Sequence, residues 1–277
     1  MPQSTNPLVA VDIGNSRIKL GRFDREARSR ELPEPAATLE LPLSSQAGDF
    51  DIERLATWCR EQMTGQADWL ISSVHRGATE RLVAAVAALG EQLGRAWPLR
   101  QIAFVDVPLV VEVDAPERVG LDRLMGAVAA DRLRPPDRAA IGVDLGTATK
   151  LCLLTEVGAF VGGAILPGLA MSARALEEQT DVLPRVDVER WRRPPLPLGK
   201  STVPAIESGI FWGAVGAIRE LVTQFSTSLS PPPVVFITGG GSQLVAEVLA
   251  EDASLDLRYL PHLVLSGVAI VDAAGNR

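Results

Sequence analysis

The chain has 277 residues, of which 47% are hydrophobic and 22% charged, a composition typical of a globular protein large enough for two domains. Its formal net charge of -7 argues against a general nucleic-acid binder, which would carry a basic surface. The two cysteines and two histidines do not cluster in the sequence, which argues against a zinc site and a disulfide framework.

The N-terminal residues Met1 to Leu8 are polar and lack the apolar segment of a signal peptide. The most apolar later stretch, Ala159 to Met171, is interrupted by Gly and Pro and is shorter than the about 20 apolar residues that cross a bilayer. We therefore expect a cytoplasmic protein with neither a membrane nor a nucleic acid as partner.

The first expected element is a β-hairpin, in which the apolar stretches Leu8 to Val11 and Ile18 to Phe23 flank a Gly-containing turn. Buried strands are then predicted at Trp69 to Val74 and Ile102 to Val105, and helices at Glu80 to Leu93 and Leu121 to Leu133. The Pro-rich stretches Leu32 to Pro42 and Arg134 to Asp137 are interpreted as loops, and the second as the domain boundary.

The second half of the chain opens with another expected hairpin, from Ala139 to Val143 and from Leu151 to Leu154. The elements predicted after it are a helix at Gly209 to Leu221, a strand at Val234 to Thr238 and a helix at Gln243 to Ala250. Loops are expected at Pro194 to Pro197 and Pro231 to Pro233.

The two hairpins share a sequence. Val11-Asp-Ile-Gly-Asn-Ser16 reappears as Val143-Asp-Leu-Gly-Thr-Ala148, and Asp12 and Asp144 lie 132 residues apart, close to half the chain. Such an internal repeat predicts two similar α/β domains, at 1–134 and 135–277, each opening with the same hairpin.

An Asp at a strand end followed by a Gly turn suits Mg-ATP. Gly14 lets the backbone approach phosphate oxygens, and Asp12 can hold Mg²⁺ through water. Asn15 and Ser16 add polar contacts, and Lys19 can neutralise phosphate charge. A single Asp-x-Gly-Asn segment is also a common hairpin turn, so the hypothesis depends on the second copy, where Thr147 offers a hydroxyl to phosphate across a cleft between the domains.

Two further segments offer groups for a substrate. Gly120-Leu-Asp-Arg123 opens a predicted helix, whose N-terminus attracts anions. Asp122 could accept a proton from an attacking hydroxyl, and Arg123 could grip a carboxylate or phosphate. Without the other motifs, an acidic helix start with a surface Arg is the favoured interpretation. Gly199-Lys-Ser-Thr202 is not a P-loop, because Pro194 stands at the required Gly and no strand precedes it. Thr202 remains a candidate hydroxyl contact.

Thr238-Gly-Gly-Gly241 follows a predicted strand, and its glycines could let a flat adenine or ribose lie against the backbone. A simple strand–helix turn explains this segment as well.

These segments, in this order and over nearly the whole chain, resemble the type III pantothenate kinase family. The segments that carry the resemblance are Asp12 to Ser16, Ile71 to Val74, Pro116 to Arg123, Asp144 to Ala148, Gly162 to Gly168, Gly199 to Thr202, Thr238 to Gly240 and Leu265 to Gly267. The resemblance implies two actin-like (ribonuclease H-like) domains with a central cleft. It also implies phosphorylation of pantothenate by ATP, the first step of coenzyme A synthesis, by a homodimer that uses Mg²⁺ and a monovalent cation, K⁺ or NH₄⁺.

By this resemblance, Asp122 is the catalytic base and Asp144 the cation ligand. The residues implied for ATP are Asp12, Ile13, Gly14, Asn15, Ser16, Arg17, Ile18, Lys19 and Thr147. The residues implied for pantothenate are Gly120, Leu121, Asp122, Arg123 and Thr202.

Four positions depart from the family pattern. Val113 replaces a Tyr, Lys150 and Cys152 replace a Thr and an Asp after Gly-Thr-Ala, and Gly126 replaces an Asn. Because strand side chains alternate, Lys150 and Cys152 share one face. Either the ammonium of Lys150 takes the role of the cation, or Lys150 extends to solvent and the cation binds at Asp144.

Three functions therefore stay open. The leading interpretation is a pantothenate kinase. The others are an actin-fold kinase for another small hydroxylated substrate and a regulatory protein on a degenerate kinase scaffold, since fold does not fix function.

Overall fold

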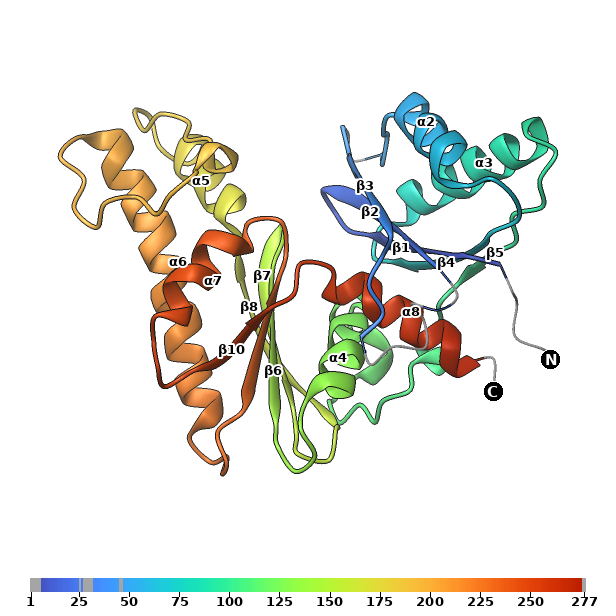
Figure 1. The fold of residues 1–277 in the computed structure, drawn as a ribbon. Coiled ribbons are helices and arrows are strands. Elements are labelled where there is room, and N and C mark those ends of the chain that lie inside the picture. The colour runs from blue at the N-terminus through green and yellow to red at the C-terminus, as the bar shows by residue number, and fades with distance from the viewer. Residues whose placement is uncertain (1–5, 25, 27–31, 45–46, 276–277) are drawn as a thin grey trace. The chain divides into compact units, whose positions relative to one another are not determined.

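The computed structural model describes residues 6–24, 26, 32–44 and 47–275 (Figure 1). The prediction for Met1 to Leu8 thus falls largely outside the described residues. The chain divides into two compact units. Unit 1 comprises Met1–Leu109, Asp114–Leu133 and His262–Arg277, and unit 2 comprises Val110–Val113 and Arg134–Pro261.

The two units contain sheets of the same design. In unit 1 the strands lie in the order β3-β2-β1-β4-β5, and in unit 2 in the order β8-β7-β6-β9-β10. In each sheet the first three strands are antiparallel and the last two continue in parallel. The strands are β1 (Leu8–Ile13), β2 (Arg17–Phe23), β3 (Ala37–Pro42), β4 (Asp68–Ser73), β5 (Leu99–Gln101), β6 (Ala140–Leu145), β7 (Ala148–Leu154), β8 (Phe160–Pro167), β9 (Val234–Thr238) and β10 (Asp256–Tyr259).

Helices follow the strands in both units. Unit 1 contains α2 (Ile52–Gln62), α3 (Arg76–Gln92), α4 (Leu121–Leu133) and α8 (Leu263–Gly275), with the short 3-10 helices η1 (Phe104–Asp106) and η2 (Pro116–Arg118). Unit 2 contains α5 (Leu169–Glu178), η3 (Val188–Arg190), α6 (Thr202–Ser226) and α7 (Ser242–Ala250). Within the described ranges, no helix is both long and apolar enough to cross a membrane.

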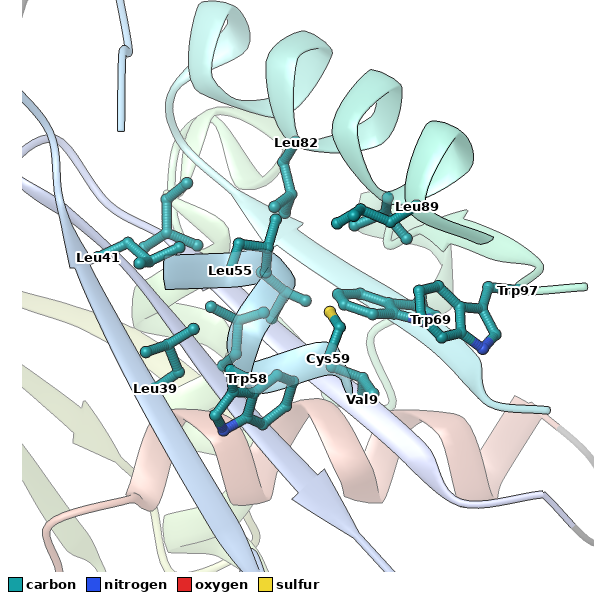
Figure 2. Close-up of a cluster of buried hydrophobic side chains, with 14 of the residues drawn as sticks. Val9, Leu39, Leu41, Leu55, Trp58, Cys59, Trp69, Leu82, Leu89 and Trp97 are labelled. Carbon is teal, nitrogen blue, oxygen red and sulfur yellow. The ribbon is translucent and has the colours of Figure 1, made fainter. Parts of the chain in front are cut away.

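The core of unit 1 forms between one face of its sheet and helices α2 and α3 (Figure 2). Alternate residues of β1, namely Val9, Val11 and Ile13, belong to this cluster. Trp69 and Trp97 close one end of it, with ring centroids 5.9 Å apart. Because strand side chains alternate, Asp12 is left on the opposite face of the sheet.

Unit 2 repeats this pattern. Ile141, Val143 and Leu145 of β6 pack with α5, α6 and α7, which leaves Asp144 on the other face. The apolar helix predicted at Gly209 to Leu221 is the middle of the longer α6, and its buried side chains belong to this core.

The last helix corrects the predicted ranges 1–134 and 135–277, because residues 262–277 belong to unit 1. Helix α8 buries most of its surface against α4 and against the sheet strands β1, β2 and β4. A Cβ at Gly267 would lie 1.9 Å from the carbonyl oxygen of Met125, so the two helix backbones touch. A side chain at position 267 would clash with that backbone, so this close crossing requires glycine there.

Two sequence predictions of local structure are wrong. The strand predicted at Ile102 to Val105 lies in fact at β5, and Val105 is exposed in the 3-10 helix η1. The supposed loop from Leu32 to Pro42 contains the strand β3, in which buried Leu39 and Leu41 alternate with exposed neighbours. The prolines in this stretch argued against a strand, but β3 lies at the edge of its sheet, where Pro is tolerated.

Candidate active site

In unit 1 the candidate residues begin at the end of β1. Asp12 is 8% exposed, and the sheet register places it opposite Lys19 on β2 and Ser72 on β4. Directly opposed residues of neighbouring strands project from the same face of a sheet. A carboxylate, an ammonium group and a hydroxyl are therefore neighbours on the face of the sheet that lies away from the core.

The hairpin turn after Asp12 is closed by a backbone hydrogen bond from Gly14 N to Arg17 O of 3.0 Å. Asn15 is exposed at the tip, so its side chain is accessible. Ile13 and Ile18 are fully buried, so only their backbone groups can serve a nucleotide. The guanidinium of Arg17 forms an ion pair of 3.0 Å with Glu40 of β3, in which both side chains are more than a third exposed.

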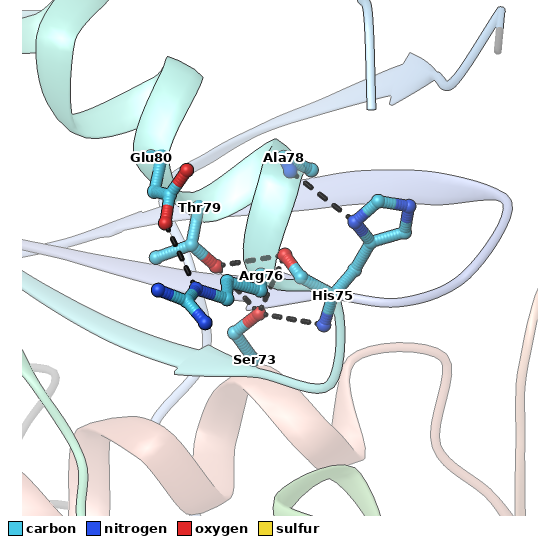
Figure 3. Close-up of polar contacts among 6 residues, drawn as sticks. All are labelled: Ser73, His75, Arg76, Ala78, Thr79 and Glu80. Carbon is cyan, nitrogen blue, oxygen red and sulfur yellow. Dashed lines mark hydrogen bonds and ion pairs between the residues drawn. The ribbon is translucent and has the colours of Figure 1, made fainter. Parts of the chain in front are cut away.

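A polar network fixes the next turn, between β4 and α3 (Figure 3). The hydroxyl of Thr79 donates to Ser73 Oγ at 2.7 Å, and the same Ser73 oxygen accepts from His75 N at 3.0 Å. Nδ1 of His75 accepts from Ala78 N at 3.2 Å and so caps α3. His75 therefore has a structural role. Val74 N donates to Ile13 O at 3.0 Å, which joins this turn to the end of β1.

Asp122 lies in the first turn of α4, where a carboxylate is stabilised by the helix dipole. Its Oδ1 accepts a hydrogen bond from Arg123 N at 2.8 Å. A Cβ at Gly120 would lie 2.6 Å from this oxygen, so glycine leaves the room that the carboxylate occupies. The same Cβ position lies 3.6 Å from Val74 Cγ1, which places the Gly120–Arg123 segment next to the turn bonded to β1.

In unit 2 the candidate residues lie at the end of β6. Asp144 is opposite Lys150 on β7 and Thr238 on β9, in the same relation that Asp12 has to Lys19 and Ser72. Here the carboxylate and the ammonium are in contact: Lys150 Nζ lies 2.8 Å from Asp144 Oδ2, with 15% and 22% of the two side chains exposed.

This ion pair bears on the monovalent cation implied for Asp144. A second cation on the same carboxylate would lie within about 4 Å of the ammonium, where like charges repel by about 4 kcal/mol at an effective dielectric of about 20. No group of three or more His, Cys, Asp or Glu side chains gathers in the described part of the chain, so Asp144 has no cluster of further carboxylates to offset this repulsion. The residues present at Asp144 do not fit a monovalent cation.

The remaining predicted residues of unit 2 lie on separate elements. Thr147 is in the turn after β6, where its carbonyl accepts from Gly168 N at 3.2 Å. Thr202 is exposed in the first turn of α6. Gly239, in the Gly run after β9, has a φ of 109°, and a Cβ there would meet Leu145 O at 2.4 Å. Packing against β6 thus explains this glycine without a nucleotide.

Val113, which departs from the family pattern, lies in a short segment that crosses into unit 2. Glu112 N donates to Phe160 O at 2.8 Å, and Phe160 N donates to Val110 O at the same distance. Val113 Cγ1 lies 3.8 Å from where a Cβ of Gly162 would be. Val113 therefore lies next to the segment from Gly162 to Gly168, which carries the family resemblance.

Sequence reasoning missed two residues near Lys19 and Asp12. Ser72 is fully buried beside Asp12, and only the strand register reveals it. His262 precedes α8, and partial burial lowers its pKa from 6.5, with the Lys19 ammonium acting in the same direction and Glu40 and Glu34 opposing. No local signal could have predicted that His262 lies close enough to Lys19, 243 positions earlier, for their charges to interact.

Comparison with known proteins gives one consistent result. The model of the type III pantothenate kinase family matches residues 8–224. A type III pantothenate kinase of Dehalococcoides mccartyi is 33% identical over 273 residues, which are 95% of this chain and 96% of that protein. A type III pantothenate kinase of Listeria welshimeri is 37% identical over 264 residues, again 95% and 96% of the two chains.

The solved structures that this chain resembles share its fold but little of its sequence. The Alp12 filament structure aligns with a TM-score of 0.53 at 9% identity, over 98% of this chain and 99% of that one. The activator of the 2-hydroxyisocaproyl-CoA dehydratase from Clostridium difficile, with bound ADPNP, aligns with a TM-score of 0.51 at 12% identity, over 98% and 95%. Together with the repeated strand order, these likenesses confirm the prediction of two α/β units of the actin-like class.

Proposed function

The chain belongs to the type III pantothenate kinase family, and we propose on this basis that it transfers a phosphoryl group from ATP to pantothenate, the first step of coenzyme A biosynthesis. The observation that carries the proposal is the family match along residues 8–224, which includes both Asp-containing hairpins and the Gly120–Arg123 segment. The regulatory alternative has less support, because the carboxylates at 12 and 122 are both present and held in place.

In unit 1 we assign Asp122 as the general base. Its carboxylate takes the proton of the attacking hydroxyl of pantothenate while the phosphoryl group is transferred. The hydrogen bond from Arg123 N holds one oxygen of this carboxylate in place. Gly120, Leu121 and Arg123 complete the pantothenate contacts of unit 1.

Phosphoryl transfer depends mostly on positioning and charge neutralisation. We assign these tasks for ATP to residues 12–19 of the first hairpin, with Lys19 as the charge that meets the phosphates. Thr147 of unit 2 contributes a hydroxyl to ATP, and Thr202 contributes one to pantothenate.

Mg²⁺ enters with ATP, and the residue types of the segment 12–16 suit it, because the Asp12 carboxylate, the Ser16 hydroxyl and the Asn15 amide oxygen are hard oxygen ligands. Asp12 would hold the hydrated ion, whose charge neutralises the phosphates. The chain's own task is to keep the Asp12 carboxylate at one place, which the sheet register achieves.

The resemblance also implies a homodimer in the cytoplasm. Both cysteines, Cys59 and Cys152, are free and buried, which suits a reducing compartment. The apolar side chains of α6 pack into the core of unit 2, so the dimer proposal rests on the family alone.

A coupled assay of ADP release, run with and without pantothenate, tests the proposed function. Pantothenate should stimulate ADP release, with one phosphorylated product formed for each ADP. Stimulation only by other members of a panel of small hydroxylated compounds would favour a kinase of different specificity. ATP binding without turnover on any compound would favour the regulatory interpretation.

A further inference from the structure

The charged residues of the two hairpins correspond position by position. Asp12 is flanked by Lys19 on the antiparallel side and by Ser72 on the parallel side. Asp144 is flanked in the same way by Lys150 and Thr238. The turns differ by one residue, because residues 14–17 separate the paired strands in unit 1 and residues 146–148 do so in unit 2. Lys150 is therefore the structural counterpart of Lys19, although their sequence contexts do not align.

The choice of lysine at both places is unusual for this chain. Of its 27 basic residues only three, at positions 19, 150 and 200, are lysine, and the other 24 are arginine. Two of the three lysines thus occupy the same register position in the two hairpins. An ammonium group is a compact point charge, whereas guanidinium is a planar fork. Both hairpins therefore carry a compact cation at the same register position.

The geometry holds the Lys150 charge in place. The ion pair with Asp144 is short, at 2.8 Å, and its two side chains are mostly buried. The stem of Lys150 projects from β7 on the face of the sheet away from the unit 2 core, like Asp144. An ammonium group has three N–H donors, so it can meet a carboxylate and other oxygen atoms together.

We propose that Lys150, anchored by Asp144, supplies the second hairpin with the positive charge that a bound monovalent cation would otherwise bring to ATP phosphates. The enzyme then needs no added K⁺. This inference rests on the proposed function of the hairpins in binding ATP, and it differs from the cation requirement that the family resemblance implies.

The test compares sodium, potassium and ammonium buffers of equal ionic strength, with two readouts: calorimetric affinity for Mg-ATP and pantothenate-dependent turnover. For the wild-type protein both readouts should change by less than about twofold between buffers. Strong activation by K⁺, or clearly tighter ATP binding in K⁺, would overturn the proposal.

Three variants at position 150 separate charge from shape. Lys150→Arg should retain only part of the turnover, though more than Lys150→Met, because it keeps the positive charge but not the compact shape of the ammonium. Lys150→Met should lose about 10²-fold or more in turnover in every buffer, the usual loss when a charge-stabilising group is removed. Lys150→Thr should lose as much in sodium but regain turnover in potassium, because the hydroxyl restores an oxygen ligand. Unchanged turnover of Lys150→Met in sodium would also overturn the proposal.

The matched control is Arg190→Met, which removes a cation from an exposed ion pair with Asp187 in the same unit. It should behave as wild type in each buffer. If the wild-type protein binds ATP but phosphorylates no pantothenate, the proposed function fails. The dependence of ATP affinity on the buffer cation then still tests whether Lys150 replaces a bound cation.

Discussion

Replacing Asp122 by Asn separates the chemistry of this residue from its structural contribution. The amide oxygen of Asn can still accept the 2.8 Å hydrogen bond from Arg123 N, and Gly120 still leaves room for it. What is lost for stability is the charge in the first turn of α4, worth up to about 1 kcal/mol. In a chain of this size that shifts Tm by about 2–4 °C.

The loss of activity should be far larger. A positioned general base contributes about 10²–10⁴-fold, or about 3–5 kcal/mol of activation free energy, and an amide cannot take the proton. The assay measures kcat for ADP release in Asp122→Asn beside a thermal melt of the same sample.

The matched control is Asp51→Asn. Asp51 also holds a helix N-terminus, accepting from Arg54 N at 2.9 Å at the start of α2. The control should show the small change in Tm with unchanged kcat. If Asp122→Asn turns over at a near-normal rate, the assignment of the base is wrong. If it instead melts far below the control, its effect on activity is structural.

Three further predictions follow from the structure and the family. Asp12→Ala should weaken or abolish the use of Mg-ATP, and an unchanged rate across a magnesium titration would count decisively against the assigned role. Because the folded state lowers the pKa of His262 below 6.5, its unfolded state binds more protons, so stability falls as pH drops through that value. His262→Gln should flatten this loss in urea unfolding between about pH 7 and pH 5, and an unchanged slope would refute the assignment. Light scattering should show a homodimer at micromolar concentration, and a monomer there would contradict the family expectation.

Much of the fold was accessible from the sequence because the two hairpins carry strong local signals. An Asp-x-Gly turn between apolar stretches predicts strand, turn and strand, and its repetition indicates a duplicated unit. The strand order of the two sheets bears this out. Strand β3 was missed because Pro33, Pro35 and Pro42 outweighed the alternation of Leu39 and Leu41 in the interpretation.

What could not be predicted depends on long-range packing. The return of α8 to unit 1 requires the backbone contact of Gly267 with Met125, which is 142 residues earlier. The pairing of Lys150 with Asp144 was within reach, because a tight turn brings residues 144 and 150 opposite each other. Predicting this pair requires the length of the second turn, and the first hairpin is no guide to it because its turn is one residue longer.

The most direct test of the central claim follows a labelled γ-phosphate from ATP. Incubation of the purified protein with labelled ATP, Mg²⁺ and pantothenate should place the label on pantothenate, at one label per ADP formed, and Asp122→Asn should not do so. Label that appears only as inorganic phosphate, or stays on ATP while the protein binds it, would contradict the account.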